Sequence, residues 1–313
     1  MSFHLEIFLQ QVINGLVLGS VYALVALGYT MVYGILGLIN FAHGDVVMIG
    51  AMTALSVAML VLGIAPDLSG PFVLLLALLG SLPICMALGY GIERVAYRRL
   101  RNAPRLAPLI TAIGISMILQ TSAMLIWGRN YYTFPEFVSN QPMNFFGASI
   151  TPAQILIVVS ATVLMYALTQ MVNRTRLGRA MRAVSENQAV ARLMGVNVNT
   201  IISITFIIGS GLGCIAGLMV ASNYNIVHYY MGFMLGLKAF TAAVLGGIGN
   251  LHGAMLGGLL LGLIESLGAG YIGDLTGGFL GSHYQDVFAF FVLIVVLIFR
   301  PSGLMGERVA ERA

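Results

Sequence analysis

The stretch RTRLGRAMRAVSENQAVARLMGVNVNT, residues 174–200, is the one long polar segment between hydrophobic spans that also has a helical pattern. Five of the fifteen basic residues of the chain lie in it, and arginines gathered between membrane spans favour the cytoplasmic side. Within the segment, Ser185, Glu186 and Asn187 predict the start of a helix. The segment is therefore expected to hold a short amphipathic helix on the cytoplasmic side, with a surface that meets another molecule.

An apolar strip follows this predicted helix start. Its members are Ala189, Val190, Leu193 and Met194, which are spaced for one face of a helix. Gly195 is expected to end the helix. On these residues alone, a solvated amphipathic linker remains the alternative.

The composition predicts a membrane protein. The chain is 59% hydrophobic and 8% charged, whereas soluble domains average about 25% charged residues. Its 38 glycines suit helices that pack closely within a membrane. We expect an all-α, polytopic helical integral membrane protein in which residues 1–313 form a single transmembrane domain. The net charge of +4 does not indicate nucleic acid, because the basic residues cluster beside hydrophobic spans.

The hydrophobic runs predict about 8–10 transmembrane helices, and the side of the membrane expected for the basic segments favours nine. Thirteen of the fifteen basic residues fall in two loops and the C-terminal tail. If all three are cytoplasmic, the N-terminus is external and nine crossings are needed, while eight or ten would require a re-entrant or split segment. The N-terminal MSFHLEIFLQQ lacks a basic region and a cleavage pattern, so the first run is expected to be a retained span. The expected spans are 12–33, 46–64, 72–92, 107–127, 154–172, 201–221, 233–248, 251–271 and 287–299.

Three segments carry a resemblance to a known family. FAHGDVVMIGA (41–51), RAVSENQAVARLMGVNV (182–198) and AFTAAVLGGIGNLHGAMLGG (239–258) together are similar to the branched-chain amino acid permeases of the LivH type, and the likeness runs over about 13–301. The coupling loop of bacterial ABC importer permeases reads Glu-Ala-Ala-x-x-x-Gly, and its helix docks on an ATPase subunit. The resemblance places the coupling loop of this chain at about 174–200, with Ala189 in place of the usual Glu and Val190 in place of the first Ala.

The resemblance implies a function and a set of partners. The chain would be the permease subunit of an ABC importer in the bacterial inner membrane and would translocate leucine, isoleucine or valine. It would work with a second related permease subunit, two cytoplasmic ABC ATPase subunits and a periplasmic substrate-binding protein. ATP and magnesium would bind to the ATPase subunits, so no cofactor is expected in this chain. The residues expected to couple to the ATPase are Ser185, Glu186, Asn187, Ala189, Ala191, Leu193 and Gly195.

The sequence contains no catalytic pattern. Lys238 is the only lysine, so a G-x-x-x-x-G-K-[ST] phosphate-binding loop is excluded. The five histidines form no H-E-x-x-H motif, while Cys85 and Cys214 fall in apolar runs as expected for buried thiols. We therefore expect no enzyme activity, no catalytic residue and no metal site in this chain. A permease for urea or short amides, and a self-sufficient secondary carrier or channel, remain the alternative functions.

Polar residues inside the hydrophobic runs are candidates for the translocation pathway. The segments NFAHG (40–44) and NLHG (250–253) interrupt hydrophobic stretches in the two halves of the chain, as broken helices do in transporters. Polar turns between spans are the alternative. Glu265 is the ionisable residue most deeply embedded in an apolar run, and such a carboxylate usually faces protein or water. The candidate pathway residues are Asn40, His43, Asp45, Asn250, His252 and Glu265.

Overall fold

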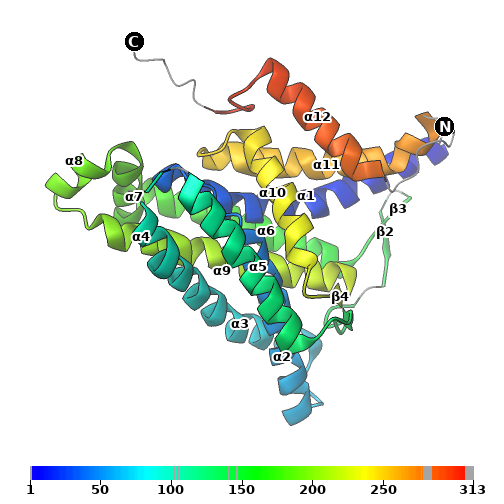
Figure 1. Ribbon diagram of the computed structural model, residues 1–313. Helices are drawn as coiled ribbons and strands as arrows, with labels where there is room; N and C mark the ends of the chain where they lie inside the picture. Colours follow the sequence, from blue (N-terminus) through cyan, green and yellow to red (C-terminus); the bar gives the residue numbers. More distant parts are fainter. Residues whose placement is uncertain are drawn as a thin grey trace.

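The computed structural model describes residues 2–101, 103–104, 106–139, 141–145, 147–275, 277 and 284–306. Within these residues the chain is an assembly of helices with four short strands (Figure 1). Each of the nine expected spans falls on a helix, and only the seventh runs past the end of its helix. The elements are α1 (Ser2–Leu36), α2 (His43–Ile64), α3 (Gly70–Ile92), the π-helical turn η1 (Glu93–Tyr97), α4 (Arg98–Leu100), α5 (Leu106–Trp127), β1 (Tyr132–Thr133), β2 (Met143–Phe145), β3 (Ala148–Ile150), α6 (Pro152–Arg174), α7 (Arg176–Glu186), α8 (Gln188–Leu193), α9 (Val198–Tyr224), β4 (Ile226–Val227), α10 (Met231–Gly246), α11 (Leu251–Leu275) and α12 (Gln285–Phe299).

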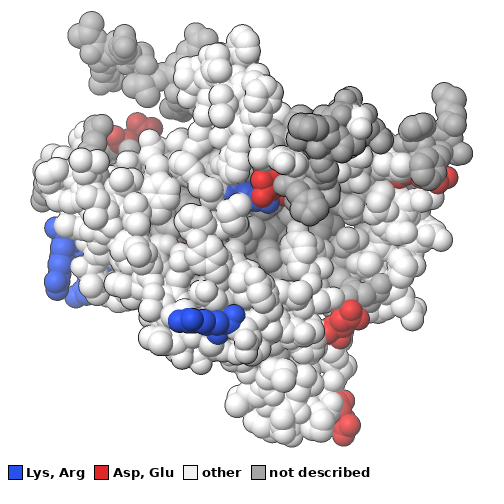
Figure 2. Space-filling view, turned by 45° about the vertical axis from the view of Figure 1, so that its right-hand side comes forward, with Lys and Arg blue, Asp and Glu red and all other residues white. Residues whose placement is uncertain are grey.

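Seven helical stretches among the described residues are long and apolar enough to cross a membrane. They are α1, α2, the continuous run from α3 to α4, α5, α6, α9 and α11, while α10 and α12 supply shorter apolar helices. Most residues of α1 and α9 are buried, whereas only a minority of the residues of α3, α5 and α6 are buried. Figure 2 shows a face on which charged side chains are few, as a lipid-facing surface requires. The expected polytopic helical fold is confirmed.

Glycines allow α1 and α11 to pack with their backbones in contact. A Cβ atom added to Gly19 would lie 2.8 Å from the Cα of Leu259, and one added to Gly262 would lie 2.2 Å from the backbone nitrogen of Gly19. Small residues are what permit such close approach between membrane helices. Figure 1 shows the two helices side by side. The high glycine content therefore serves helix packing here.

The two ends of the helical assembly differ in character. β1 and β4 come from the loops that precede α6 and follow α9, and they pair antiparallel with Tyr132 opposite Val227. We call the end that carries the strands the strand end. α7 and α8 project at the opposite end, which we call the coupling end (Figure 1). The two basic loops meet there, because Arg101 donates a hydrogen bond to Asn199 Oδ1 at 2.6 Å.

Candidate coupling surface and translocation cavity

The coupling segment begins with α7, which is anchored at its start. The Thr175 side chain caps the helix by accepting a hydrogen bond from the backbone N–H of Gly178 at 3.0 Å. Arg182 donates to the carbonyl oxygen of Val172, near the end of α6. Met181 is buried on the inner face of the helix. α7 is therefore a fixed support for the short helix that follows it.

α8 is capped at its start and hydrogen-bonded to α1. The Asn187 side chain accepts hydrogen bonds from the backbone N–H groups of Ala189 and Val190 at 2.9 and 3.1 Å. Gln188 Nε2 donates to the carbonyl oxygen of Ile35 at 3.0 Å, next to the last residue of α1. This hydrogen bond connects the first residue of α8 directly to the end of α1.

The structure corrects the expected start of this helix and confirms its end. Ser185 and Glu186 are the last residues of α7, and the chain bends at Asn187 (φ −157°, ψ 107°) because that side chain caps α8. Gly195 adopts a φ of +84°, in the left-handed region that favours glycine. The following N–H then donates to the carbonyl oxygen of Ala191 at 3.0 Å, a common way of closing a helix.

α8 presents an apolar surface outward at the coupling end. The side chains of Leu193 and Met194 are 86% and 79% exposed, and that of Val190 is 52% exposed. Ala191 is 2% exposed, so its side chain is not part of this exposed surface, and its part in coupling stays a prediction. The apolar strip occupies the outer side of α8, and Ala191 consequently faces the rest of the protein.

A buried carboxylate, that of Glu93, joins η1 to the start of α9. Glu93 is fully buried, its Oε2 lies 2.9 Å from Arg98 Nη2, and the same oxygen accepts a hydrogen bond from Ser203 Oγ at 2.7 Å. Arg101 forms a second ion pair with Glu93 and also bonds to Asn199. Burial lowers the pKa of the Arg101 guanidinium, and the charge of Glu93 opposes that shift. The sequence analysis missed this network, because its members lie up to 110 residues apart.

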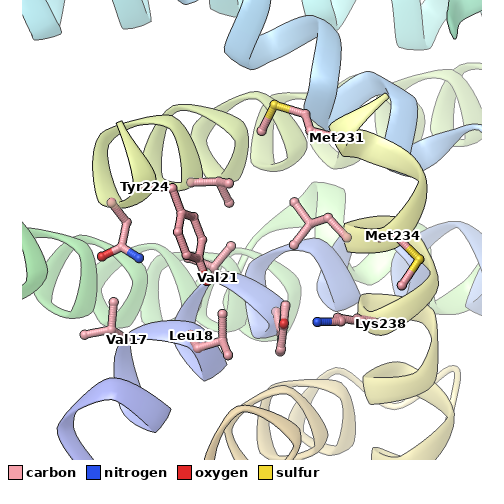
Figure 3. A pocket seen from close by; sticks show the side chains of 11 residues that line it. Val17, Leu18, Val21, Tyr224, Met231, Met234 and Lys238 are labelled. Carbon is pink, nitrogen blue, oxygen red and sulfur yellow. The ribbon is translucent and has the colours of Figure 1, made fainter. Parts of the chain in front are cut away.

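A cavity of about 170 Å³ lies between α1, α9 and α10 (Figure 3). It is near the strand end, since Tyr224 in its wall almost directly precedes β4. Lys238 is the one charged side chain in its wall, and Figure 3 shows its ammonium group extending from α10 toward α1. The wall consists of Val17, Leu18, Val21, Tyr22, Val220, Asn223, Tyr224, Met231, Met234, Leu235 and Lys238.

Two carboxylates hold Lys238 in place. Its Nζ lies 2.7 Å from Glu265 Oε1 and 2.7 Å from Asp286 Oδ1, and the Tyr22 hydroxyl donates to Glu265 Oε2 at 2.9 Å. Glu265 is 2% exposed, so it faces protein, as an intramembrane carboxylate is expected to do. The sequence offered a signal for the pair: Lys238 and Glu265 are opposite charges in two separate apolar runs.

The first polar interruption is buried at the start of α2. Asn40, His43 and Asp45 are 4%, 2% and 1% exposed. The Asp45 carboxylate accepts a hydrogen bond from Gln120 at 3.0 Å and another from Ser116, both on α5. Polar backbone and side chains at membrane depth must be buried in this way or line a cavity. Their part in the pathway remains a prediction.

The second polar interruption lies at the coupling end. Asn250 accepts a hydrogen bond from the backbone N–H of Gly253 at 3.0 Å and donates to the carbonyl oxygen of Met305 at 3.0 Å. His252 is exposed. Asn250 thus caps α11 and fastens the C-terminal segment, which favours the alternative of a polar turn. The cavity wall contains none of the six candidate pathway residues, although one of them, Glu265, forms an ion pair with Lys238 of the wall.

The two cysteines and the possible metal ligands were expected to have structural roles only. Cys85 and Cys214 are buried, free thiols, as the sequence predicts. In the part of the chain that the structure describes, no group of three or more His, Cys, Asp and Glu side chains could hold a metal ion.

Comparison with known proteins identifies the family. The model of the family described as branched-chain amino acid transport system / permease component matches residues 11–297. The chain belongs to this family. The permease is 47% identical over 312 residues to the high-affinity branched-chain amino acid transport system permease protein BraD of Pseudomonas aeruginosa, covering 97% of this chain and 98% of that protein. It is 43% identical over 311 residues to the permease protein LivH of Escherichia coli, covering 97% of each.

A more distant relative belongs to another transport system. The autoinducer 2 import system permease protein LsrC of an Enterobacter species is 32% identical over 197 residues, which is 60% of this chain and 56% of that protein. The resemblance to LivH-type permeases read from the sequence is confirmed. The permease is a multi-pass protein of the inner membrane, and its relatives are transport subunits and not enzymes.

Proposed function

We propose that the permease is the membrane-spanning subunit of a bacterial ABC importer that carries leucine, isoleucine and valine across the inner membrane. The observation that carries this proposal is end-to-end similarity, at 47% and 43% identity, to two proteins named as high-affinity branched-chain amino acid permeases. The cavity beside Lys238 and the exposed strip on α8 support it from the geometry.

The cavity has the chemistry that an aliphatic amino acid needs. Val17, Val21 and Met234 provide apolar wall for the substrate side chain, and burial of aliphatic groups is favourable. Lys238 offers an ammonium group to the substrate carboxylate. Asp286 is the more exposed of the two partners of Lys238, at 31% against 3% for Glu265, so the substrate carboxylate takes its place. Glu265 then keeps Lys238 positioned.

Energy would reach the cavity through α8 and α1. The exposed strip of α8 would dock on one of two cytoplasmic ATPase subunits, which bind ATP and magnesium, so this chain needs no cofactor. Gln188 connects α8 to the end of α1, and α1 contributes Val17 and Tyr22 to the cavity wall. A rigid helix that touches both sites provides a mechanical connection between them. A second related permease and a periplasmic substrate-binding protein would complete the importer.

Uptake measurements test the proposal. Cells that express the permease with its partner subunits should accumulate labelled leucine, and deletion of the permease should abolish that uptake while leaving urea uptake unchanged. Lys238→Met should lower leucine uptake, because the substrate carboxylate loses its cation. Uptake of urea or of short amides in preference to leucine would refute the substrate. Undiminished leucine uptake with a catalytically inactive ATPase partner would favour a self-sufficient carrier instead.

A further inference from the structure

An apolar groove runs along the outside of the permease near the coupling end. It encloses about 560 Å³ between α5 and the continuous helix formed by α3, η1 and α4, which lie beside each other in Figure 1. Its wall is apolar apart from Arg99 and Thr111. The groove covers the last part of the 70–100 span, so it occupies the leaflet at the coupling end, where the basic loops favour the cytoplasmic side.

The π-helical turn keeps this groove straight. Ala87, Gly91, Val95 and Arg99 lie in its wall at intervals of four residues. In a continuous α-helix, with about 3.6 residues per turn, such a series would drift around the axis. η1 is wider, because its hydrogen bonds span five residues, and it compensates for the drift. Gly91 has open space where a side chain would begin, so it leaves room in the groove.

The arginines around η1 divide into two kinds. Arg98 and Arg101 point inward and form ion pairs with Glu93. Arg94 and Arg99 are exposed, and neither has a carboxylate within ion-pair distance among the described residues. Arg94 lies over the ring of Tyr90, 6.0 Å from its centre, and Arg99 stands at the open end of the groove. Two arginines without a carboxylate partner among the described residues therefore lie at headgroup level beside the apolar groove.

We propose that this groove binds an anionic phospholipid of the cytoplasmic leaflet. One acyl chain lies along Gly91, Val95 and Ile115, and the phosphate contacts Arg99. The guanidinium group forms paired hydrogen bonds with phosphate oxygens, and each basic residue near a membrane surface adds to the attraction for anionic lipid. A neighbouring protein helix would cover the apolar wall but would match Arg99 only with an acidic side chain at that level, whereas an anionic phospholipid brings its phosphate to that level. The charge at the end of the groove therefore selects a lipid over a protein partner.

Two variants and two matched controls test the site. Gly91→Leu fills the groove from a position with open space, and Gly114→Leu makes the same change at an equally open glycine that is absent from the groove wall. Arg99→Gln removes the cation at the groove, and Arg129→Gln removes an exposed arginine at the other end of α5. None of these residues belongs to the cavity beside Lys238.

The experiment measures lipid binding to the complete importer by native mass spectrometry, with phosphatidylglycerol and phosphatidylcholine as probes. The parent should retain phosphatidylglycerol in preference to phosphatidylcholine. Arg99→Gln should weaken phosphatidylglycerol binding by about fivefold, and Gly91→Leu should abolish the most tightly held lipid, while both controls match the parent. Equal binding of the two lipids by the parent, or undiminished binding by Gly91→Leu, would overturn the proposal. So would efficient cross-linking of a cysteine placed at Val95 to the second permease subunit.

Discussion

The ion pair between Lys238 and Glu265 permits a quantitative test, because it is buried and its partners are known. Their side chains are 15% and 3% exposed, and the atoms are 2.7 Å apart. Removing one member of a buried pair typically costs about 3 to 5 kcal/mol, because the other charge is left uncompensated. Glu265→Leu leaves Lys238 with Asp286, so we expect a loss near the lower end, about 3 kcal/mol. Lys238→Met leaves Glu265 with the Tyr22 hydroxyl alone, and we expect about 4 kcal/mol.

The double variant separates stability from transport. Lys238→Met combined with Glu265→Leu removes both charges and leaves only Asp286, which is 31% exposed and can be hydrated. The double variant should therefore lose only about 1 kcal/mol relative to the parent, which is less than either single variant loses, since apolar replacement of a whole buried pair is often nearly neutral. Leucine uptake by this variant should nevertheless stay low, because the cation in the cavity wall is gone.

The assay is a double-mutant cycle of unfolding free energies, measured on purified permease in mixed micelles with increasing denaturing detergent. Uptake is measured in parallel at matched membrane levels. Single-variant losses that simply add in the double variant would refute the structural reasoning. Normal uptake by a stable double variant would refute the assignment of Lys238 to the substrate site.

Three further predictions concern other parts of the permease. Leu193→Asp should weaken co-purification of the ATPase subunits and lower uptake about tenfold or more, because burial of one apolar side chain is worth about 1.5 to 3 kcal/mol. Met305→Asp is the control, since Met305 is 44% exposed at the same end of the permease. Equal effects of the two substitutions would contradict the docking surface. Glu93→Ala should lower the free energy of unfolding by about 3 kcal/mol, because two arginines lose their partner, and an unchanged melting temperature would argue against the network. Burial lowers the pKa of His228, so below about pH 6.5 the unfolded chain binds more protons than the folded chain, and the free energy of unfolding decreases as the pH falls. His228→Gln should remove that part of the acid sensitivity. Identical pH profiles of stability for the parent and the variant would contradict this.

Much of the fold follows from local sequence. A run of about 20 apolar residues must form a helix in a membrane, because no water is present to satisfy exposed backbone groups. This is why each expected span falls on a helix. Gly195 was identified as the end of α8 for an equally local reason, since a glycine readily adopts the left-handed φ that closes a helix. The two basic loops were assigned to the same side of the membrane by charge alone, and the hydrogen bond from Arg101 to Asn199 agrees with that assignment.

The candidate sites depended on contacts that local sequence does not specify. Glu265 was recognised as a buried carboxylate, yet its partners Lys238 and Tyr22 lie 27 and 243 residues away, and only the packing of α1, α10 and α11 brings them together. Ala191 was expected to take part in coupling because it lies within the motif, whereas its side chain is 2% exposed and faces the rest of the protein. A sequence therefore determines which segments enter the membrane, because that depends on each segment's own transfer into lipid. The tertiary structure decides which polar groups meet, because that depends on which helix faces pack together.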